Sequence, residues 1–121
     1  MAKNTSRAGR LADHIQREIA GLIHTELKDP RVELVTVTDV EVSGDGHHAQ
    51  VFFTTLRGED AIQPALEGLH SASGLLRSRL AKSLRIRTVP DLHFVYDESI
   101  ERGARLSRLI ERAVGDSTDE G

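Results

Sequence analysis

The stretch that most limits the fold is a β-branched run followed closely by a second apolar run, with a glycine turn between them. LVTVTDVEVS, residues 34–43, is rich in Val and Thr, which favour strands, and AQVFFTTL, residues 49–56, has the same character. Ser43-Gly44-Asp45-Gly46 separates the two runs with residues typical of turns. The two runs are therefore predicted to form an antiparallel β-hairpin.

The valines of the first run change face partway along it. Val35 and Val37 share one parity, whereas Val40 and Val42 share the other. Because alternate residues of a strand point to opposite faces, this change predicts either a β-bulge near residues 38–39 or a strand that is buried on both faces.

A helical pattern precedes the hairpin. Apolar residues recur at three- and four-residue spacing through residues 11–27. Thr5 or Ser6 can cap the start of this helix, and Pro30 is expected to end it.

A pair of helices joined by a small-residue corner is expected after the hairpin. Asp60 and Gln63 have the spacing of a capping box, which places the start of the first helix at Asp60. Residues 71–74, Ser-Ala-Ser-Gly, then interrupt the helical pattern, and a second helix is expected to run to about Leu84.

The remaining elements complete an α+β order. A third strand is predicted over residues 91–97, followed by a last helix that starts near Asp97 or Ser99. The crossover between the second and third strands should be right-handed, which makes those two strands parallel. The predicted fold is a two-layer α+β domain in which a three-stranded mixed sheet packs against helices.

One domain is expected over residues 1–115, with residues 1–6 as a flexible arm and residues 116–121 as a disordered acidic tail. The 121 residues include no Cys, so there can be no disulfide, thiolate metal site or Cys nucleophile. The basic N-terminus lacks the apolar segment of a signal peptide, and no apolar run is long enough to span a bilayer. A cytoplasmic monomer without membrane contact is expected.

Positive charge is concentrated locally, although the formal net charge is −3. Residues 68–90 hold five bases and no acid, and residues 1–12 hold three bases and no acid. Exposed helices usually pair bases with acids four residues away, but the helix after the corner has no acid to pair with. Local patches of this kind decide whether a polyanion can bind.

The corner and the helix after it are predicted to contact phosphates. Gly74 would let a phosphodiester backbone approach closely, and the start of a helix favours anions. Leucines 76, 80 and 84 should be buried, with residues 79, 82 and 85 on the opposite side and residue 77 on the flank. The candidate RNA-binding residues are Ala72, Ser73, Gly74, Arg77, Arg79, Lys82, Arg85 and Arg87, with Arg7, Arg10 and Arg31 as second-rank candidates.

Aromatic content limits the mode of binding. The chain has three Phe, one Tyr and no Trp, and all four rings lie in predicted strands. Proteins that read unpaired bases need exposed rings on which the bases stack. Binding is therefore expected to depend on phosphate contacts and shape.

Three long motifs carry a family resemblance: ELKDPRVELVTVTDVEVSGDG, SASGLLRSRLAKSLRIRTVPDLHFVYDES and GARLSRLIE. With them the chain resembles the ribosome-binding factor A family of bacterial small-subunit assembly factors, from about Arg7 to Val114. The resemblance implies a type II K-homology (KH) fold. It also implies that an Ala-x-Gly kink, here Ala72-Ser73-Gly74, replaces the GxxG loop of ordinary KH domains.

The resemblance implies a function as well. Members of this family bind the free or immature 30S subunit, assist maturation of the 5′ end of 16S rRNA and support growth in the cold. They have no catalytic activity, so no catalytic residue, cofactor or metal is expected here. An assembly GTPase that releases the factor is implied as a further partner.

Two other classes of function remain open from the residues alone. A small hydrolase could use Asp91, His93 and Asp97, which share one parity along the third strand. A protein–protein module could instead present the leucine-anchored helix to an acidic partner. His47 and His48 follow a turn without a spaced carboxylate or Cys, so they are expected to be exposed loop residues and not metal ligands.

Overall fold

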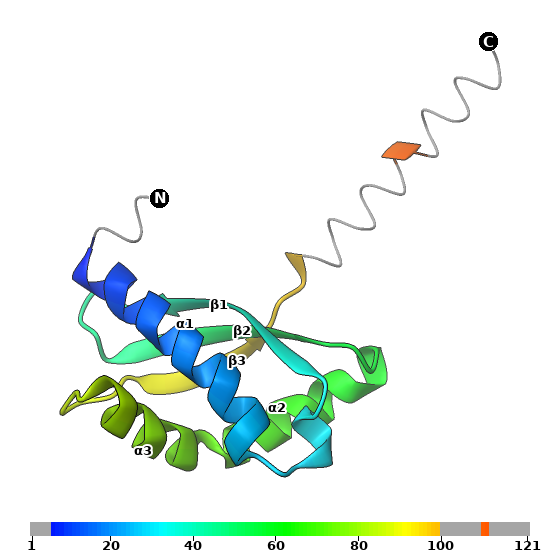
Figure 1. The fold of residues 1–121 in the computed structure, drawn as a ribbon. Coiled ribbons are helices and arrows are strands. Elements are labelled where there is room, and N and C mark those ends of the chain that lie inside the picture. The colour runs from blue at the N-terminus through cyan, green and yellow to red at the C-terminus, as the bar shows by residue number, and fades with distance from the viewer. Residues whose placement is uncertain (1–5, 100–109, 112–121) are drawn as a thin grey trace.

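A computed structural model of the chain describes residues 6–99 and 110–111 (Figure 1). The predicted last helix and acidic tail lie almost entirely outside this described part, as do residues 1–5 of the predicted arm. The elements in chain order are α1 (Arg7–Glu26), the 3₁₀ turn η2 (Pro30–Val32), β1 (Val35–Val42), β2 (His48–Thr55), the 3₁₀ turn η3 (Glu59–Ala61), α2 (Ile62–Ser71), α3 (Ser73–Leu84) and β3 (Asp91–Tyr96).

The strands form one mixed sheet in the order β1-β2-β3. β1 and β2 pair antiparallel, whereas β2 and β3 pair parallel, which confirms the predicted pairing. The register shifts between Val37 and Asp39, which confirms the predicted bulge. Because of this extra residue, Val35 and Val40 are both buried, with 1% of each exposed, although they differ in parity.

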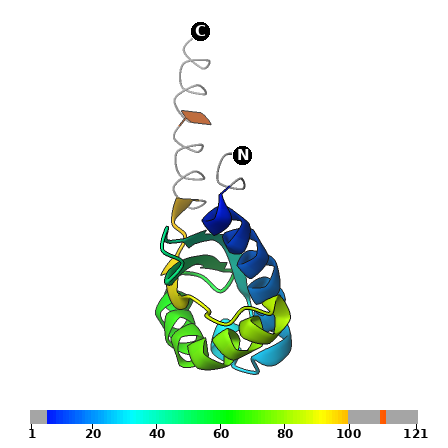
Figure 2. The same cartoon turned by 90° about the vertical axis from the view of Figure 1, so that its left-hand side faces the viewer.

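The helices α1, α2 and α3 pack on one face of the sheet, which Figure 2 shows edge-on. α1 contributes an isoleucine ladder at three- and four-residue spacing, the sheet contributes Phe53 and its neighbours, and α3 contributes two fully buried leucines. No described helix is both long and apolar enough to cross a membrane. The core comprises Ala12, Ile15, Ile19, Ile23, Val32, Val35, Val40, Ala49, Val51, Phe53, Ala65, Leu69, Leu76, Leu80, Val89 and Leu92.

The first helix begins as predicted and ends earlier than predicted. The Ser6 hydroxyl accepts a hydrogen bond from the Gly9 N–H at 2.8 Å, as an N-cap residue does. The helix ends at Glu26, and Leu27 is already extended, with φ −98° and ψ 125°. Pro30 therefore does not end α1 but is the first residue of η2. Asp29, the N-cap residue of η2, has an extended backbone, as residues before proline tend to have.

The predicted capping box at Asp60 is wrong. The chain leaves β2 through Gly58, whose φ is +94°, and winds into η3 before α2 begins. Asp60 is thus inside the 3₁₀ turn, and the N-cap of α2 is Ala61, which makes no side-chain cap hydrogen bond. The N-cap of α2 is therefore one residue later than predicted, because a 3₁₀ turn precedes the helix and the capping-box spacing does not reveal that turn.

Candidate nucleic-acid interface

The corner between α2 and α3 is a single residue, Ala72. Its N–H donates to the carbonyls of Gly68 and Leu69, each at 3.1 Å, and the Ser73 hydroxyl donates to the His70 carbonyl at 2.7 Å. These bonds satisfy carbonyls at the end of α2, so the small residues hold the corner tight. Gly74 is exposed and has no atom within 4 Å of the position that a Cβ would occupy, so a ligand backbone can approach there.

A groove of about 600 Å³ opens beside this corner, between α2, the start of α3 and β3. Three of the predicted RNA-contact residues, Ser73, Gly74 and Arg77, line this groove, but the lining residues of α2 were not predicted. Gln63 and His70 lie on α2 seven residues apart, a spacing that places polar side chains on one helix face and could have revealed them. The lining residues are Gln63, Leu66, Glu67, His70, Ser73, Gly74, Arg77, Asp91, Leu92, His93 and Phe94.

Arg77 is largely occupied in joining α3 to the start of β3. Its guanidinium donates to the carbonyl of Val89 at 2.9 Å and to that of Pro90 at 3.2 Å. One of its nitrogens also lies 3.4 Å from a carboxylate oxygen of Asp91. Arg77 therefore lines the groove as a partly neutralised cation whose first role is to hold the chain segment before β3.

The predicted position of Arg79 is wrong. Arg79 does not lie opposite the leucines with Lys82 and Arg85 but on the flank of α3 that faces α1, where its Nε is 3.5 Å from Glu26 Oε1. This Nε is inaccessible to solvent and makes no hydrogen bond to a described residue. Arg77 and Arg79 are two residues apart on a helix and hence about 200° apart, so they point to different neighbours.

Among the candidate cations on and just after α3, those at its end remain available. We call Lys82, Arg85 and Arg87 the α3 cation cluster. All three are exposed, and no side chain among them makes a hydrogen bond or ion pair with a residue in the described part of the chain. Eleven residues separate Gly74 from Arg85, which corresponds to about 16 Å of helix. The corner and the cluster therefore mark the two ends of one surface along α3.

Arg85 adopts a backbone conformation that favours glycine. It follows the last residue of α3 with φ 54° and ψ 41°, and is the only described non-glycine residue with positive φ. The left-handed region costs an ordinary residue about 1–2 kcal/mol. Arginine at a position where glycine would relieve strain is the kind of outlier that suggests a functional side chain.

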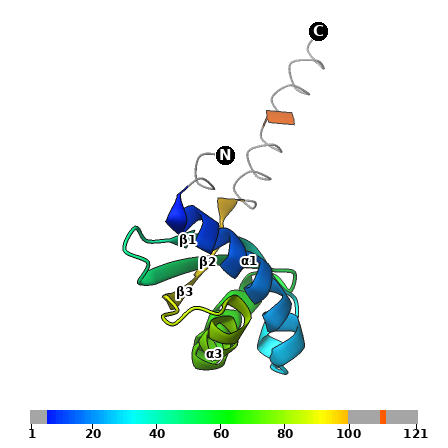
Figure 3. The ribbon, with the colours of Figure 1, turned by 60° about the vertical axis from the view of Figure 1, so that its left-hand side comes forward.

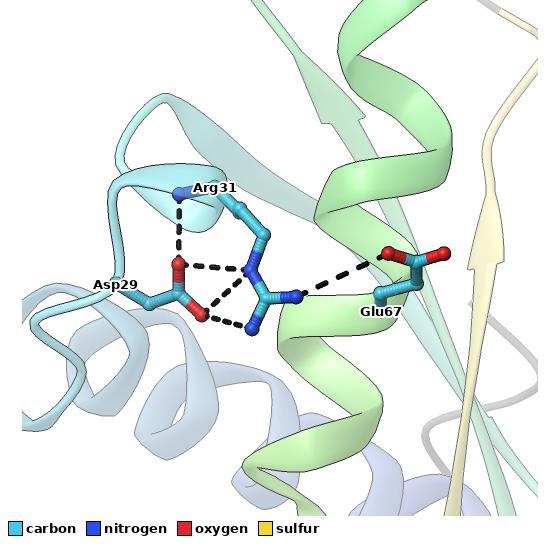
Figure 4. A network of polar contacts seen from close by, with 3 residues as sticks. All are labelled: Asp29, Arg31 and Glu67. Carbon is cyan, nitrogen blue, oxygen red and sulfur yellow. Dashed lines mark hydrogen bonds and ion pairs between the residues drawn. The ribbon is translucent and has the colours of Figure 1, made fainter.

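Arg31 is held within a local network (Figure 4). Its guanidinium donates to both carboxylate oxygens of Asp29, the shortest bond being 2.7 Å, and lies 4.0 Å from Glu67. The hydrogen bonds from Arg31 lower the pKa of the Asp29 carboxyl, and the same bonds raise the pKa of Arg31. Arg31 thus joins η2 to α2, which makes it a weaker candidate for phosphate contact than its charge suggests.

The other second-rank candidates lie at the start of α1. Arg7 and Arg10 occupy its first turn and are exposed. They therefore belong to a helix and not to a flexible arm. Their side chains are distant in sequence from the corner, and the described structure does not join them to the groove.

The residues suggested for a hydrolase do not form an acid–base pair: Asp91 and His93 both line the groove, but no hydrogen bond joins them. Asp91 faces Arg77, while His93 Nε2 lies 3.1 Å from His48 Nδ1 on the exposed face of the sheet. Asp97 accepts the Thr38 hydroxyl at 2.6 Å, about 13 Å along an extended chain from His93. Within residues 6–99 and 110–111, no group of three or more His, Asp or Glu side chains is placed to hold a metal ion.

The element order, the mixed sheet and the small-residue corner define the class of the domain. It is a KH-like α+β domain of type II, in which a tight corner replaces an extended loop between the two central helices. The model of one family with this fold, ribosome-binding factor A, matches residues 7–110. The chain belongs to the ribosome-binding factor A family.

Relatives and solved structures agree with this assignment. Ribosome-binding factor A of Nitrosomonas europaea is 57% identical over 115 residues, covering 95% of this chain and 98% of the relative. Ribosome-binding factor A of Aromatoleum aromaticum is 53% identical over 116 residues, covering 96% of this chain and 91% of the relative. The crystal structure of ribosome-binding factor A from Thermus thermophilus superimposes with a TM-score of 0.68 at 33% identity, covering 76% of this chain and 97% of that one.

A second Thermus thermophilus structure concerns a complex. It is a homology model of ribosome-binding factor A fitted into a cryo-electron microscopy map of its complex with the 30S subunit. It superimposes with a TM-score of 0.61 at 33% identity, covering 72% of this chain and 91% of that one.

Proposed function

We propose that this protein binds the small (30S) ribosomal subunit late in assembly and contacts 16S rRNA through phosphates along α3. By binding one rRNA conformation more tightly than others, it would shift the population toward that conformation and so assist maturation of the 5′ end. The proposal includes a cytoplasmic monomer that supports growth in the cold and is released by an assembly GTPase. It rests on family membership and on the 30S complex of the Thermus thermophilus relative.

The observation that carries the RNA contact is the α3 cation cluster. Its three exposed side chains form no ion pair with a described residue, so nothing in that part of the chain neutralises their charge. Phosphate contacts of this type release counterions, and binding therefore weakens steeply as salt rises. The open approach at Gly74, at the other end of α3, suits a nucleic-acid backbone that runs along the helix.

The proposed action is binding without catalysis. An acid–base mechanism would need a base within hydrogen-bond reach of the group that it deprotonates, held by an orienting partner. Asp91 and His93 instead contact Arg77 and His48 respectively, and Asp97 is engaged with Thr38. Replacing His93 by Ala should consequently leave 30S binding almost unchanged, whereas a hydrolase would lose turnover.

Co-sedimentation with purified 30S subunits tests the proposal. Lys82→Gln, Arg85→Gln and Arg87→Gln each remove one charge without breaking a side-chain hydrogen bond or ion pair within residues 6–99. Each should weaken binding, and each should lower the slope of log affinity against log salt by about 0.7–0.9. Arg79 is unsuitable for this experiment because its replacement would also break the contact with Glu26.

Arg57→Gln provides a control for the loss of one positive charge away from α3. Arg57 is exposed and lies at the far end of β2, where it pairs with Glu33 at 3.0 Å. The Arg57→Gln variant should bind 30S subunits as tightly as wild type does. If the three α3 variants also bind like wild type at every salt concentration, α3 is not the RNA-binding surface.

A protein partner is the remaining rival explanation. An acidic protein could bind the same cations, since charge alone does not distinguish a carboxylate surface from phosphates. Capture of subunits on immobilised protein before and after ribonuclease treatment separates the two. An RNA contact should be lost on digestion, whereas a contact with a ribosomal protein should survive.

A further inference from the structure

The exposed face of α1 carries three arginines within residues 7–17, Arg7, Arg10 and Arg17, together with His14 and His24. Seven residues of α1 are exposed, and none of them is acidic. Six recur at alternating three- and four-residue spacing, which places them in one line along the helix. We call this line the α1 stripe: Arg7, Arg10, His14, Arg17, Gly21 and His24.

The acids of α1 lie away from the centre of the stripe. Asp13, Glu18 and Glu26 are all half-buried at its flanks. Glu18 accepts a hydrogen bond from the Ser83 hydroxyl at 3.0 Å, and Glu26 lies beside Arg79. An ordinary solvated helix face mixes both signs of charge, so this segregation needs a separate explanation.

Gly21 is the second unexplained feature of the stripe. It lies in the middle of a 20-residue helix, where glycine is less stable than alanine by roughly 0.5–1 kcal/mol. Packing does not require it, because a Cβ at this position would meet nothing within 4 Å. The missing side chain leaves a flat place between Arg17 and His24 at which another molecule can approach the helix backbone.

We propose that the α1 stripe is a second RNA-binding surface, which contacts the phosphates of an rRNA segment different from the one on α3. Charge complementarity identifies the occupant, because three arginines in one line, followed by the open backbone at Gly21, fit a sugar-phosphate strand that runs along the helix. This inference rests on the proposed function, since it assumes that the protein binds rRNA.

The two cationic surfaces are separated by carboxylates. α1 and α3 lie beside each other on the same side of the sheet (Figure 3). Along the seam between them, α1 presents Glu18 and Glu26 to Ser83 and Arg79 of α3. A phosphate strand that followed both surfaces would have to cross these carboxylates. The geometry therefore favours two strands, and a protein that holds two rRNA segments at once fixes their relative position.

Two measurements with full-length protein and purified 30S subunits test the inference. The first is affinity as a function of salt for Arg7→Gln/Arg17→Gln, with Arg57→Gln as control. The double variant should bind more weakly than the control, and its slope of log affinity against log salt should be lower by about 1.5. Arg10 is left unchanged because it makes a further contact within the chain.

The second measurement is hydroxyl-radical footprinting of 16S rRNA. The double variant of the stripe should lose one set of backbone protections, and Lys82→Gln/Arg87→Gln of the α3 cation cluster should lose another. Gly21→Gln places a long neutral side chain in the flat part of the stripe and should lose the same protections as the stripe variant. Circular dichroism should show that Gly21→Gln remains folded, because glutamine is a better helix former than glycine.

The outcomes separate this inference from the function on which it rests. If the stripe variants match Arg57→Gln in affinity and slope while the α3 variants bind weakly, the second surface does not exist and the proposed function stands. If both double variants lose the same protections, one RNA segment crosses both helices and the inference is wrong. If the wild-type protein failed to bind 30S subunits, both the proposed function and the inference of a second surface would be wrong.

Discussion

Gly68→Ala offers the sharpest test of how α2 is fixed to the rest of the molecule. Gly68 lies within α2 where that helix packs on η2. A Cβ added there would be 2.9 Å from Cγ1 of Val32, 3.1 Å from Oδ2 of Asp29 and 3.4 Å from Cβ of Arg31. Real contacts are almost never as short as the first of these distances, so the helix or the turn would have to move.

The expected change in the free energy of unfolding of Gly68→Ala is the sum of two opposing effects. Overpacking of a filled site typically costs about 1–3 kcal/mol, and relief is difficult here because Val32 is only 1% exposed and Asp29 is held by Arg31. Replacing a helical glycine by alanine gains roughly 0.5–1 kcal/mol. The expected net effect is a loss of about 1–2 kcal/mol in the free energy of unfolding.

Urea denaturation, followed by circular dichroism, measures this loss directly. The midpoint should fall while the slope of the transition stays constant. Gly21→Ala is the matched control, since the same substitution occurs in a helix but in open space. It should raise the free energy of unfolding by roughly 0.5–1 kcal/mol, so the two variants should shift in opposite directions.

A double variant identifies the cause. Val32→Ala removes the methyl groups nearest to Gly68, so Gly68→Ala should cost less in the Val32→Ala background than in wild type. The idea that α2 packs closely on η2 would be refuted if Gly68→Ala were as stable as Gly21→Ala. It would also be refuted if the loss of free energy of unfolding caused by Gly68→Ala were the same in the Val32→Ala background as in wild type.

Three further predictions concern single positions. Arg85→Gly should raise the free energy of unfolding by about 1 kcal/mol, because glycine relieves the left-handed strain. The same variant should bind 30S subunits more weakly than wild type. A variant that is no more stable than wild type would contradict the expected relief of strain. Ser6→Ala should lower the thermal midpoint through the loss of about 1 kcal/mol of N-cap stabilisation, whereas an unchanged midpoint would mean that the Gly9 N–H is satisfied otherwise. Asp29→Asn should be less stable than wild type at pH 7. Because Arg31 lowers the pKa of Asp29, its stabilisation is present above the ordinary pKa of about 4 and is lost as pH falls through the lowered pKa. The two stabilities should thus converge in strong acid, and a difference independent of pH would exclude the ion pair as its source.

Much of the fold could be predicted because its signals are local. The isoleucine ladder of α1, the parity change of β1 and the small-residue corner each depend on residues within a few positions of one another. The physical cause is the fixed period of each element, about 3.6 residues for a helix and two for a strand, which sets the buried face wherever the core lies. The parallel pairing of β2 and β3 also followed, because a helical crossover imposes it.

The candidate site was predictable only in part. The sequence indicated which residues carry positive charge on α3 but not which of them have partners. Arg79 is neutralised by Glu26 of α1, and Arg77 is held by carbonyls before β3. These partners are brought near by tertiary packing, and a helical wheel contains no information about them.

The sequence by itself determined the order of elements, a small-residue corner within residues 71–74 and the presence of an acid-free segment around α3; the structure narrowed the corner to Ala72. Only the tertiary structure decided which of the cations around α3 remain available: Glu26 of α1 neutralises Arg79, carbonyls before β3 hold Arg77, and the α3 cation cluster is left. The reason is that secondary structure depends on local periodicity, whereas the neutralisation of a charge depends on which distant segment lies opposite it.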